Sequence, residues 1–394
     1  MNRREFLTAG GLAAATPLLA MTADAQASAQ ATTDLFKRID FTSDGLGLDP
    51  AEYATLLRDV AMARGFEADY YSNGGAIAEL EQTFARLLGK QAAIFLPTGT
   101  LANHLAIRKL AGDDRRVLVQ AESHLYNDSG DCAETLSGLN LVPLAPGRST
   151  IELAEVKHWI ERSAGGRVET KVGVISIESP VRRKGHEMFE PGELERICGY
   201  AREQGIRLHL DGARLFNLPF HSGKSVKDHA ALFDTVYVSL WKHFNGAAGA
   251  MLAGDASFIE GLFHMRRMFG GSQPFAWPQA AVAARYVDGY EQEYAKAWRA
   301  ADALIDRLQS DGRFSIRRAP HGTCRFYLSA NGVAAEVFVE RLRKHGVVLS
   351  QGTTDAGEFP MQVNATLLRM PPAALARIFI QAMAGDETGA GPGA

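Results

Sequence analysis

The chain has 394 residues, of which 46% are apolar and 22% charged, which is the composition of a globular protein with one large α/β domain and a smaller one. Its formal net charge of −3 gives no electrostatic reason to expect nucleic acid as a partner. Three cysteines without a CxxC pair argue against a disulfide framework and against a zinc site, so we expect no bound metal.

The first 25 residues have the features of an export signal. A twin-arginine pair, Arg3-Arg4, precedes a weakly apolar stretch that is too short and too interrupted to span a membrane. Ala23-Asp24-Ala25 supplies a small-x-small cleavage pattern. We predict a signal peptide over 1–25, a polar linker over 26–38 and a periplasmic protein exported in its folded state.

Strand and helix patterns alternate from residue 92 to residue 254, which predicts a mostly parallel sheet. Apolar spacing predicts helices over 50–64, 76–88, 151–163, 191–204, 258–268, 279–308, 334–345 and 372–383. Strands are expected over 92–96, 117–121, 172–177, 206–210, 324–328 and 347–349, on both sides of Lys242, and briefly from Ile39. We place an N-terminal segment and a large domain over 39–290, a smaller C-terminal α/β domain over 291–384 and a disordered tail over 385–394.

The strand over 92–96 runs into Pro97-Thr98-Gly99-Thr100, and a helix then begins. A helix N-terminus after a turn of small residues binds anions, because its free N–H groups and the positive end of its dipole face the ligand. Many α/β proteins have such a turn without a phosphate, so this motif alone leaves both interpretations open.

Polar residues follow two further strands. His124 comes just after the strand over 117–121, and Asp211 follows the strand over 206–210, with Arg214 three residues later. Ligands of open α/β sheets bind at the carboxyl ends of the strands. Taken singly, the histidine also fits a core or surface position, and the Asp–Arg pair also fits a salt-bridged turn.

Lys242 lies among Leu240, Trp241 and Phe244, between two apolar strands. A buried ammonium group is costly unless it is paired, so such a lysine tends to lose its proton. A neutral amine at a strand end is a nucleophile able to form an imine, and the small residues over 246–250 would let a bulky ring lie close to the backbone. The alternative is an ordinary loop lysine.

Together these segments resemble the threonine aldolase and β-eliminating lyase family of pyridoxal-phosphate (PLP) enzymes, which has the aspartate-aminotransferase fold (fold type I). The resemblance is carried by Ala93–Thr100 with Asn103, by Leu208–Asn217 and by Ser239–Lys242, in the order and spacing of the family. It covers nearly the whole mature chain, and the export signal indicates a twin-arginine branch. Because the three motifs follow one another in the order and spacing of the family, the resemblance argues against the interpretation of Lys242 as an ordinary loop lysine.

The resemblance implies the catalytic and cofactor-binding residues. Lys242 would bind PLP covalently, and Asp211 would pair with the pyridine nitrogen and keep it protonated. Gly99 and Thr100 would hold the phosphate. His124 would stack on the ring and is the candidate base for the substrate hydroxyl.

The resemblance also implies how substrate and subunits are held. Arg214 and Arg369 would clamp the carboxylate of the amino acid, and Ser43 would assist them. Tyr71 and Arg267 would reach across a subunit interface. Tyr71 would contribute to the pocket of the neighbouring subunit, and Arg267 would contact the phosphate bound there. We therefore expect a homodimer or homotetramer with shared active sites.

The chain departs from the family at three places. After Glu178 it has Ser179-Pro180-Val181-Arg182 in place of a run with a second histidine, which suggests an altered substrate, such as one with an extra acidic group near Arg182. After Lys242 it has His243-Phe244-Asn245 where glycines are usual, which predicts a crowded pocket. Gln273-Pro274 replaces a further phosphate arginine, so Arg267 would hold that charge alone.

The first functional hypothesis is a PLP-dependent carbon–carbon lyase that cleaves a β-hydroxy-α-amino acid, such as threonine, to glycine and an aldehyde. The second is another PLP reaction on a small amino acid, either β-elimination or racemisation. The third is a binding protein with a degenerate cofactor site, which the presence of lysine, aspartate and histidine together argues against.

Overall fold

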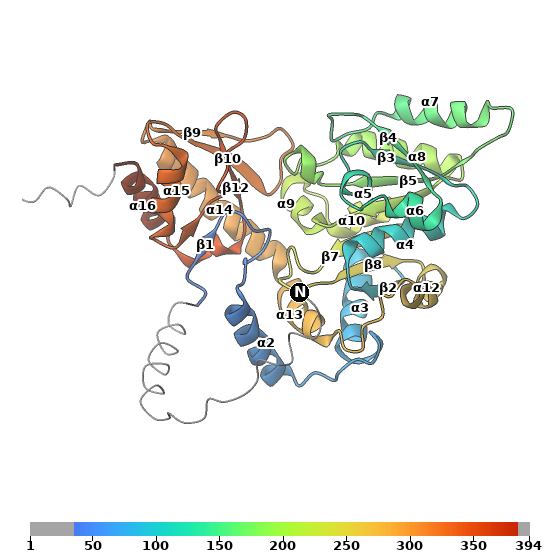
Figure 1. The fold of residues 1–394 in the computed structure, drawn as a ribbon, viewed down its shortest axis with the longest axis horizontal. Helices are drawn as coiled ribbons and strands as arrows, with labels where there is room; N and C mark the ends of the chain where they lie inside the picture. The colour runs from blue at the N-terminus through green and yellow to red at the C-terminus, as the bar shows by residue number, and fades with distance from the viewer. Residues whose placement is uncertain (1–34, 385–394) are drawn as a thin grey trace, which may run out of the picture. The chain divides into compact units, whose positions relative to one another are not determined.

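The computed structural model describes residues 35–384 (Figure 1). The predicted signal peptide, most of the predicted linker and the predicted disordered tail lie outside these residues. The described residues from Arg38 onward form one compact unit. Within the described residues, no helix combines the length and the apolar character needed to cross a membrane.

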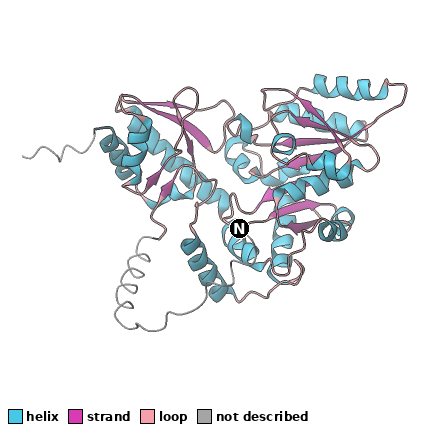
Figure 2. Ribbon diagram, in the orientation of Figure 1, coloured by secondary structure: helices cyan, strands magenta, loops and turns pink. Residues whose placement is uncertain are grey.

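A seven-stranded sheet forms the centre of the larger part of this unit (Figure 2). Its strands, from one edge to the other, are β2 (Ala92–Leu96), β8 (Ala250–Gly254), β7 (Thr235–Ser239), β6 (Arg207–Asp211), β5 (Val172–Glu178), β3 (Arg116–Gln120) and β4 (Asn140–Leu144). Only β8 runs antiparallel to its neighbours in this sheet, so the predicted mostly parallel sheet is confirmed.

The sheet is built from short apolar strands between helices, as the alternating pattern predicts. The helices of this part are α2 (Pro50–Arg64), α3 (Gly75–Leu88), α4 (Gly99–Ala111), α5 (His124–Asn127), α6 (Cys132–Ser137), α7 (Leu153–Ala164), α8 (Pro191–Glu203), α9 (Leu218–Ser222), α10 (Val226–Ala231), α11 (Ala256–Glu260), α12 (Leu262–Met268) and α13 (Trp277–Val287), with 3-10 turns η1 (Arg182–Lys184) and η2 (Leu215–Asn217). The apolar faces of α3, α7, α8, α10 and α13 pack with the strands in one core, which includes Phe84, Ile175 and Phe244. The helices α2, α4, α5, α6, α11 and α12 contribute to smaller apolar clusters.

The C-terminal part has its own core around a three-stranded antiparallel sheet. Its elements are α14 (Tyr290–Gln309), β9 (Phe314–Arg317), β10 (Arg325–Ala330), α15 (Ala335–Arg343), β11 (Val347–Val348), β12 (Phe359–Gln362), η3 (Ala365–Arg369) and α16 (Pro372–Ala384). The first strand, β1 (Ile39–Asp40), pairs in parallel with β11 and so joins this part, whereas the sequence analysis placed residue 39 in one range with the large domain (Figure 1).

Three details differ from the sequence prediction. The edge strand β4 was missed, because Asn140 and Pro143 interrupt its apolar pattern, and an edge strand tolerates proline. The helix expected over 279–308 is two helices, α13 and α14, separated where Gly289 caps α14. The helix expected over 258–268 is likewise divided into α11 and α12, at Gly261.

Buried histidines make the fold sensitive to acid. Burial lowers the pKa to about 4 for His104, His209 and His229, and to about 3 for His243. Each is therefore neutral when folded but binds a proton near pH 6.5 when unfolded, so its stabilisation is lost as pH falls from about 6.5 towards 4. Glu81 and Glu178, whose pKa values burial raises to about 7, act in the opposite sense.

We expect the free energy of unfolding to fall on the order of 1 kcal/mol for each of these histidines between pH 6.5 and 4.5, measured by urea unfolding. Replacing buried His229, whose Nε2 bonds to Ser222 Oγ at 2.9 Å, with glutamine should reduce this pH dependence. Replacing exposed His158 on α7 with glutamine is the control and should leave the pH dependence of unfolding unaltered. Equal pH dependence in wild type and His229→Gln would contradict the explanation.

Candidate active site

Five of the predicted residues line one cavity of about 430 Å³ at the carboxyl edge of the central sheet. Lys242 follows β7, Asp211 ends β6, and His124 begins α5; Gly99 and Thr100 begin α4. The full lining is Pro97, Thr98, Gly99, Thr100, Asn103, His124, Asp211, Tyr237, Trp241, Lys242, Ala247, Ala248 and Gly249. Of these, Tyr237 was not singled out from the sequence as a site residue.

Lys242 is buried, with 8% of its surface exposed, and its Nζ lies 5.6 Å from the centre of the Trp241 ring. Burial lowers the pKa of the amine, and the nearby Arg214 guanidinium lowers it further, while Asp211 acts against both. More of this amine is therefore neutral at a given pH than for a free lysine, which is the form that attacks a carbonyl group.

Asp211 is held in a fixed orientation by two donors. The Asn103 side-chain amide donates to Asp211 Oδ2 at 2.6 Å, and the Ala213 backbone N–H donates to Oδ1 at 3.1 Å. The other end of Asn103 is fixed as well, since its Oδ1 lies 2.9 Å from His209 Nε2, and His209 Nδ1 lies 2.8 Å from Thr235 Oγ1. This buried chain keeps the carboxylate pointed at the cavity in one position.

The turn before α4 has a shape that lets a ligand come close to its backbone. Thr98 caps the helix, its hydroxyl oxygen accepting the Leu101 N–H at 3.2 Å. A Cβ atom added to Gly99 would lie 1.9 Å from the hydroxyl oxygen of Tyr237, which is 3% exposed beneath the turn. Only glycine fits at this position, and it leaves backbone N–H groups of a helix N-terminus at the cavity wall, where an anion is favoured.

His124 is the first residue of α5, after the capping residue Ser123. Its backbone N–H donates to Glu178 Oε2 at 2.6 Å, and its Nδ1 lies 3.4 Å from Ser129 Oγ. Burial lowers the pKa of the ring, although Asp211 acts in the opposite direction. A neutral imidazole at the cavity wall is able to accept a proton.

Arg214 lies under the site in a buried ion pair. Its Nε and Nη2 donate to the two carboxylate oxygens of Asp44, at 2.8 and 2.7 Å, and the Asp44 Oδ1 also accepts Gln362 Nε2 at 2.8 Å. Although burial alone would raise the pKa of Asp44, Arg214 holds it well below its ordinary value. Asp44, which the sequence analysis did not single out, already occupies two donors of the predicted carboxylate clamp.

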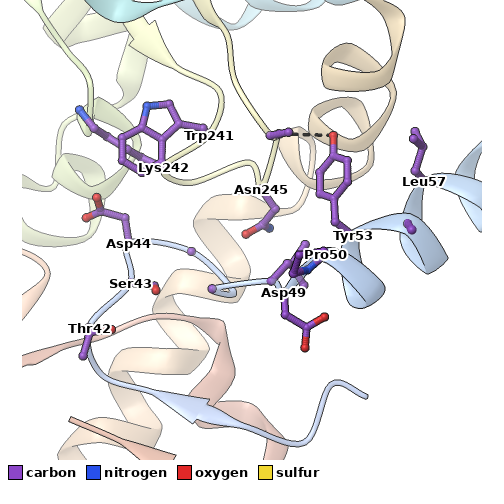
Figure 3. A pocket seen from close by; sticks show the side chains of 16 residues that line it. Thr42, Ser43, Asp44, Asp49, Pro50, Tyr53, Leu57, Trp241, Lys242 and Asn245 are labelled. Carbon is purple, nitrogen blue, oxygen red and sulfur yellow. Dashed lines mark hydrogen bonds between the residues drawn. The ribbon is translucent and has the colours of Figure 1, made fainter. Parts of the chain in front are cut away.

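Ser43 and Asp44 line a second cavity, of about 720 Å³, which shares Trp241, Lys242 and Ala247 with the first (Figure 3). Its outer wall comes from the start of α2, where Pro50, Tyr53, Ala54 and Leu57 lie. The Tyr53 hydroxyl oxygen accepts the Ala247 N–H at 3.3 Å, drawn as the dashed line in Figure 3. Arg369 does not line either cavity; its guanidinium donates to the Arg38 carbonyl oxygen.

Tyr71 and Arg267 form a pair of their own. The Arg267 guanidinium lies 4.8 Å from the centre of the Tyr71 ring, and neither residue lines either cavity of this chain. Arg267 is exposed on α12.

The structure gives contacts for the three segments at which the sequence differs from the family. Arg182 does not line the cavities, since its guanidinium, like that of Arg183, bonds to Asp128. His243 stacks on Tyr290 at 4.8 Å between ring centres and lines neither cavity, whereas Asn245 lines the larger cavity together with Lys242. Gln273 pairs with Ser72, whose hydroxyl oxygen accepts its N–H at 3.1 Å.

Comparison with known proteins identifies the class. Residues 50–323, more than half of the chain, match the family described as beta-eliminating lyase, so the chain belongs to that family. This confirms the family resemblance read from the sequence.

The chain is also similar to individual proteins, three of them at 26% to 29% identity. The low specificity L-threonine aldolase of Saccharomyces cerevisiae is 29% identical over 235 residues, 59% of this chain and 59% of that protein. The match thus spans less than two thirds of that relative. An alanine racemase of Cochliobolus carbonum is 26% identical over 292 residues, 71% of this chain and 74% of that protein. A Listeria monocytogenes structure, provisionally named an L-allo-threonine aldolase, has a TM-score of 0.73 and 28% identity, and the match covers 89% of this chain and 97% of that one.

Proposed function

We propose that the protein is a PLP-dependent aldolase-type lyase, which cleaves a β-hydroxy-α-amino acid such as threonine to glycine and an aldehyde. The observation that carries this proposal is the single cavity in which Lys242, Asp211, His124 and the Gly99 turn meet. A buried amine, a buried carboxylate and a helix N-terminus are the three groups that fit the aldehyde, the ring nitrogen and the phosphate of PLP. The family and its threonine aldolase relatives support the same reaction.

The residues of this cavity would then divide the tasks of the reaction among them. When bound, PLP supplies an electron sink for the bond that breaks at the substrate Cα. Lys242 Nζ would hold the cofactor and move a proton at the substrate Cα, while Asp211 would keep a proton on the ring nitrogen. His124 accepts the proton of the substrate hydroxyl. Gly99 and Thr100 would hold the phosphate through backbone N–H groups.

Arg214, Arg369 and Ser43 remain the candidates for the substrate carboxylate. Ser43 and the Asp44–Arg214 pair lie beside the cavity shared with Lys242, so Arg214 would bind a carboxylate in addition to Asp44. Arg369, on η3 away from the cavity lining, would reach the carboxylate after a movement of that turn. Replacement of either arginine should raise KM more than it lowers kcat if its role is binding.

The test is aldehyde release from threonine, allo-threonine and phenylserine by the purified protein, followed with an alcohol dehydrogenase. We expect turnover of at least one of them, with glycine formed in equal amount. A protein that shows the visible absorbance of bound PLP but cleaves none of them would retain the cofactor proposal and reject the reaction.

A second candidate is racemisation, or β-elimination, on a small amino acid. The alanine racemase relative favours it, because that match extends over 71% of this chain. Loss of optical rotation from L-alanine, or pyruvate released from L-serine, without aldehyde from threonine, would support this candidate instead.

The proposed oligomer is a homodimer or homotetramer with shared sites, in which Tyr71 and Arg267 serve the cavity of a neighbouring copy. Apolar side chains near the pair, Tyr70, Phe263, Met268 and Phe275, are exposed by 44% to 69% in the single chain, which is consistent with burial against a second copy. Mixing the inactive variants Lys242→Ala and Arg267→Ala should restore activity at one site of each mixed dimer, whereas independent sites would restore none.

We also propose that the protein is exported by the twin-arginine route and acts in the periplasm. Arg3-Arg4 and the small residues up to Ala25 support this proposal. Full-length protein should be found shortened in the periplasmic fraction, and Arg3→Lys with Arg4→Lys should retain it in the cytoplasm.

The Gly99 turn gives a direct test of the phosphate position. In Gly99→Ala the new Cβ would overlap the Tyr237 hydroxyl, so the turn has to shift at a cost of about 1–3 kcal/mol. We expect PLP affinity, titrated by absorbance, to fall about tenfold or more. Gly289→Ala is the matched control, because Gly289 has φ −111° and open space around it. Unchanged PLP affinity in Gly99→Ala would place the phosphate elsewhere.

A further inference from the structure

Glu178 is a buried carboxylate to which the proposed reaction gives no task. It ends β5 and pairs in register with Asp211 at the end of β6, so both side chains leave the same face of the sheet at the same edge. Only 4% of Glu178 is exposed. It does not line the cavity, and it lies one layer behind the residues that do.

Both carboxylate oxygens of Glu178 are used by backbone N–H groups from different loops. Oε2 accepts the N–H of His124, the first residue of α5, at 2.6 Å. Oε1 accepts the N–H of Arg182, the first residue of η1, at 2.9 Å. One side chain thus joins the segment that follows β3 to the segment that follows β5.

The backbone of Glu178 is anchored separately. The Glu178 N–H donates to Gln120 Oε1 at 2.8 Å, and the Gln120 amide donates to the Glu178 carbonyl oxygen at 2.8 Å. These two bonds fix the ends of β3 and β5 to each other without the carboxylate. The carboxylate is therefore not needed to hold the strands and acts only on the two loops.

We propose that Glu178 is a positioning residue for His124, which it holds against the cavity by accepting the first backbone N–H of α5. The inference rests on the proposed function, in which His124 accepts the hydroxyl proton of the substrate. The Ser123 cap and the Asn127 amide hold the neighbouring backbone of this four-residue helix, but the N–H of His124 itself donates to Glu178. A displacement of about 1 Å at a catalytic group can cost a hundredfold in rate.

The task needs the ionised form of Glu178, which the two N–H groups favour and which burial and the charge of Asp211 oppose. Burial, and then the charge of Asp211, raise the pKa of Glu178 to about 7, while the N–H bonds from Arg182 and His124 favour its ionised form. Only the ionised form has two full acceptors for the two N–H groups. The charged or titratable groups that face it are Asp211, Arg214, His124, Lys242, Tyr237 and Arg183.

The test is the variant Glu178→Gln, whose amide keeps the size of the side chain but offers one acceptor in place of two. We expect kcat/KM for threonine cleavage to fall about tenfold to a hundredfold. Exchange of the glycine Cα proton with solvent, which uses Lys242 and involves no hydroxyl group, should change less than threefold. A general structural defect would lower both reactions together.

Two further variants make the test specific. In a His124→Ala background, Glu178→Gln should have no additional effect on cleavage if it acts through His124. Glu81→Gln is the matched control, since Glu81 is also a buried carboxylate with a pKa raised to about 7 and accepts the Phe95 N–H at 2.8 Å, away from the cavity. It should leave the ratio of cleavage to exchange unchanged.

Independent effects of the two changes in the double variant would overturn the inference. If the wild-type protein cleaves no β-hydroxy amino acid, the proposed function fails on its own, and the crystal structure of Glu178→Gln decides the positioning role. A displaced start of α5 would support it, and a segment over 122–129 that superposes on the wild type would overturn it.

Discussion

The variant Lys242→Ala is expected to lose at least about a thousandfold in kcat for any amino-acid substrate, because no other group replaces the nucleophile of a catalytic unit. It should also lose the visible absorbance that a protein-bound PLP gives. Reduction of the wild-type protein with borohydride after PLP binding should label one peptide, the one that contains Lys242. Both measurements follow from a buried amine whose pKa is lowered by its surroundings.

Lys90→Ala is the matched control. Lys90 is also partly buried, burial also lowers its pKa, and its Nζ donates to the Phe233 carbonyl oxygen, but it lies in neither cavity. It should keep the absorbance and the activity. An Lys242→Ala protein that retains a borohydride-sensitive band would mean that another lysine carries the cofactor.

The convergence of Lys242, Asp211, His124 and Gly99 was predictable from the sequence for a physical reason. Each of them follows a strand of a parallel sheet, and the carboxyl ends of parallel strands meet at one edge. Residues about 140 positions apart could therefore be assigned to one site once the alternating pattern was recognised. The resemblance then supplied what each chemical group would do.

The Asp44–Arg214 pair could not be predicted in the same way. Its partners are 170 residues apart, and Asp44 comes from the segment after β1, which belongs to the C-terminal part. Ser43 was named only through the family resemblance, and Asp44 was given no role from the sequence. That this turn reaches under Lys242 depends on the parallel pairing of β1 with β11, and a two-residue strand has no periodicity that specifies its partner.

The same limit applies to the group formed by Asp44, His186 and Cys324. The side-chain ligand atoms of these three lie within 4.8 Å of one another, although they come from distant segments. Gln362 donates to both Asp44 and Cys324, and Cys324 Sγ lies 2.9 Å from His186 Nδ1, so this is a hydrogen-bonded network beside Arg214. Sequence spacing gives no signal for contacts that only the packing of two cores creates.

The variant Asp44→Ala should have the largest effect on stability. It leaves the Arg214 guanidinium buried, with 6% of its side chain exposed, and without the carboxylate that accepts two of its bonds. Breaking one partner of a buried pair costs roughly 3–5 kcal/mol, against about 0–1 kcal/mol for an exposed pair. We expect a loss of this size in urea unfolding at pH 7, whereas Glu340→Ala, which removes the exposed pair with Arg343, should change stability by less than about 1 kcal/mol.

The pH dependence of this variant separates the ion pair from simple loss of packing. Because Arg214 holds the pKa of Asp44 below its ordinary value, the pair stabilises the fold above about pH 4, and that contribution is lost as pH falls further. The difference between wild type and Asp44→Ala should therefore shrink on acidification below pH 4. Added acetate should also stabilise Asp44→Ala more than wild type, since it can replace the missing carboxylate at Arg214. A difference that is constant with pH and unaffected by acetate would mean that the cavity left by the side chain, not the uncompensated charge, causes the loss.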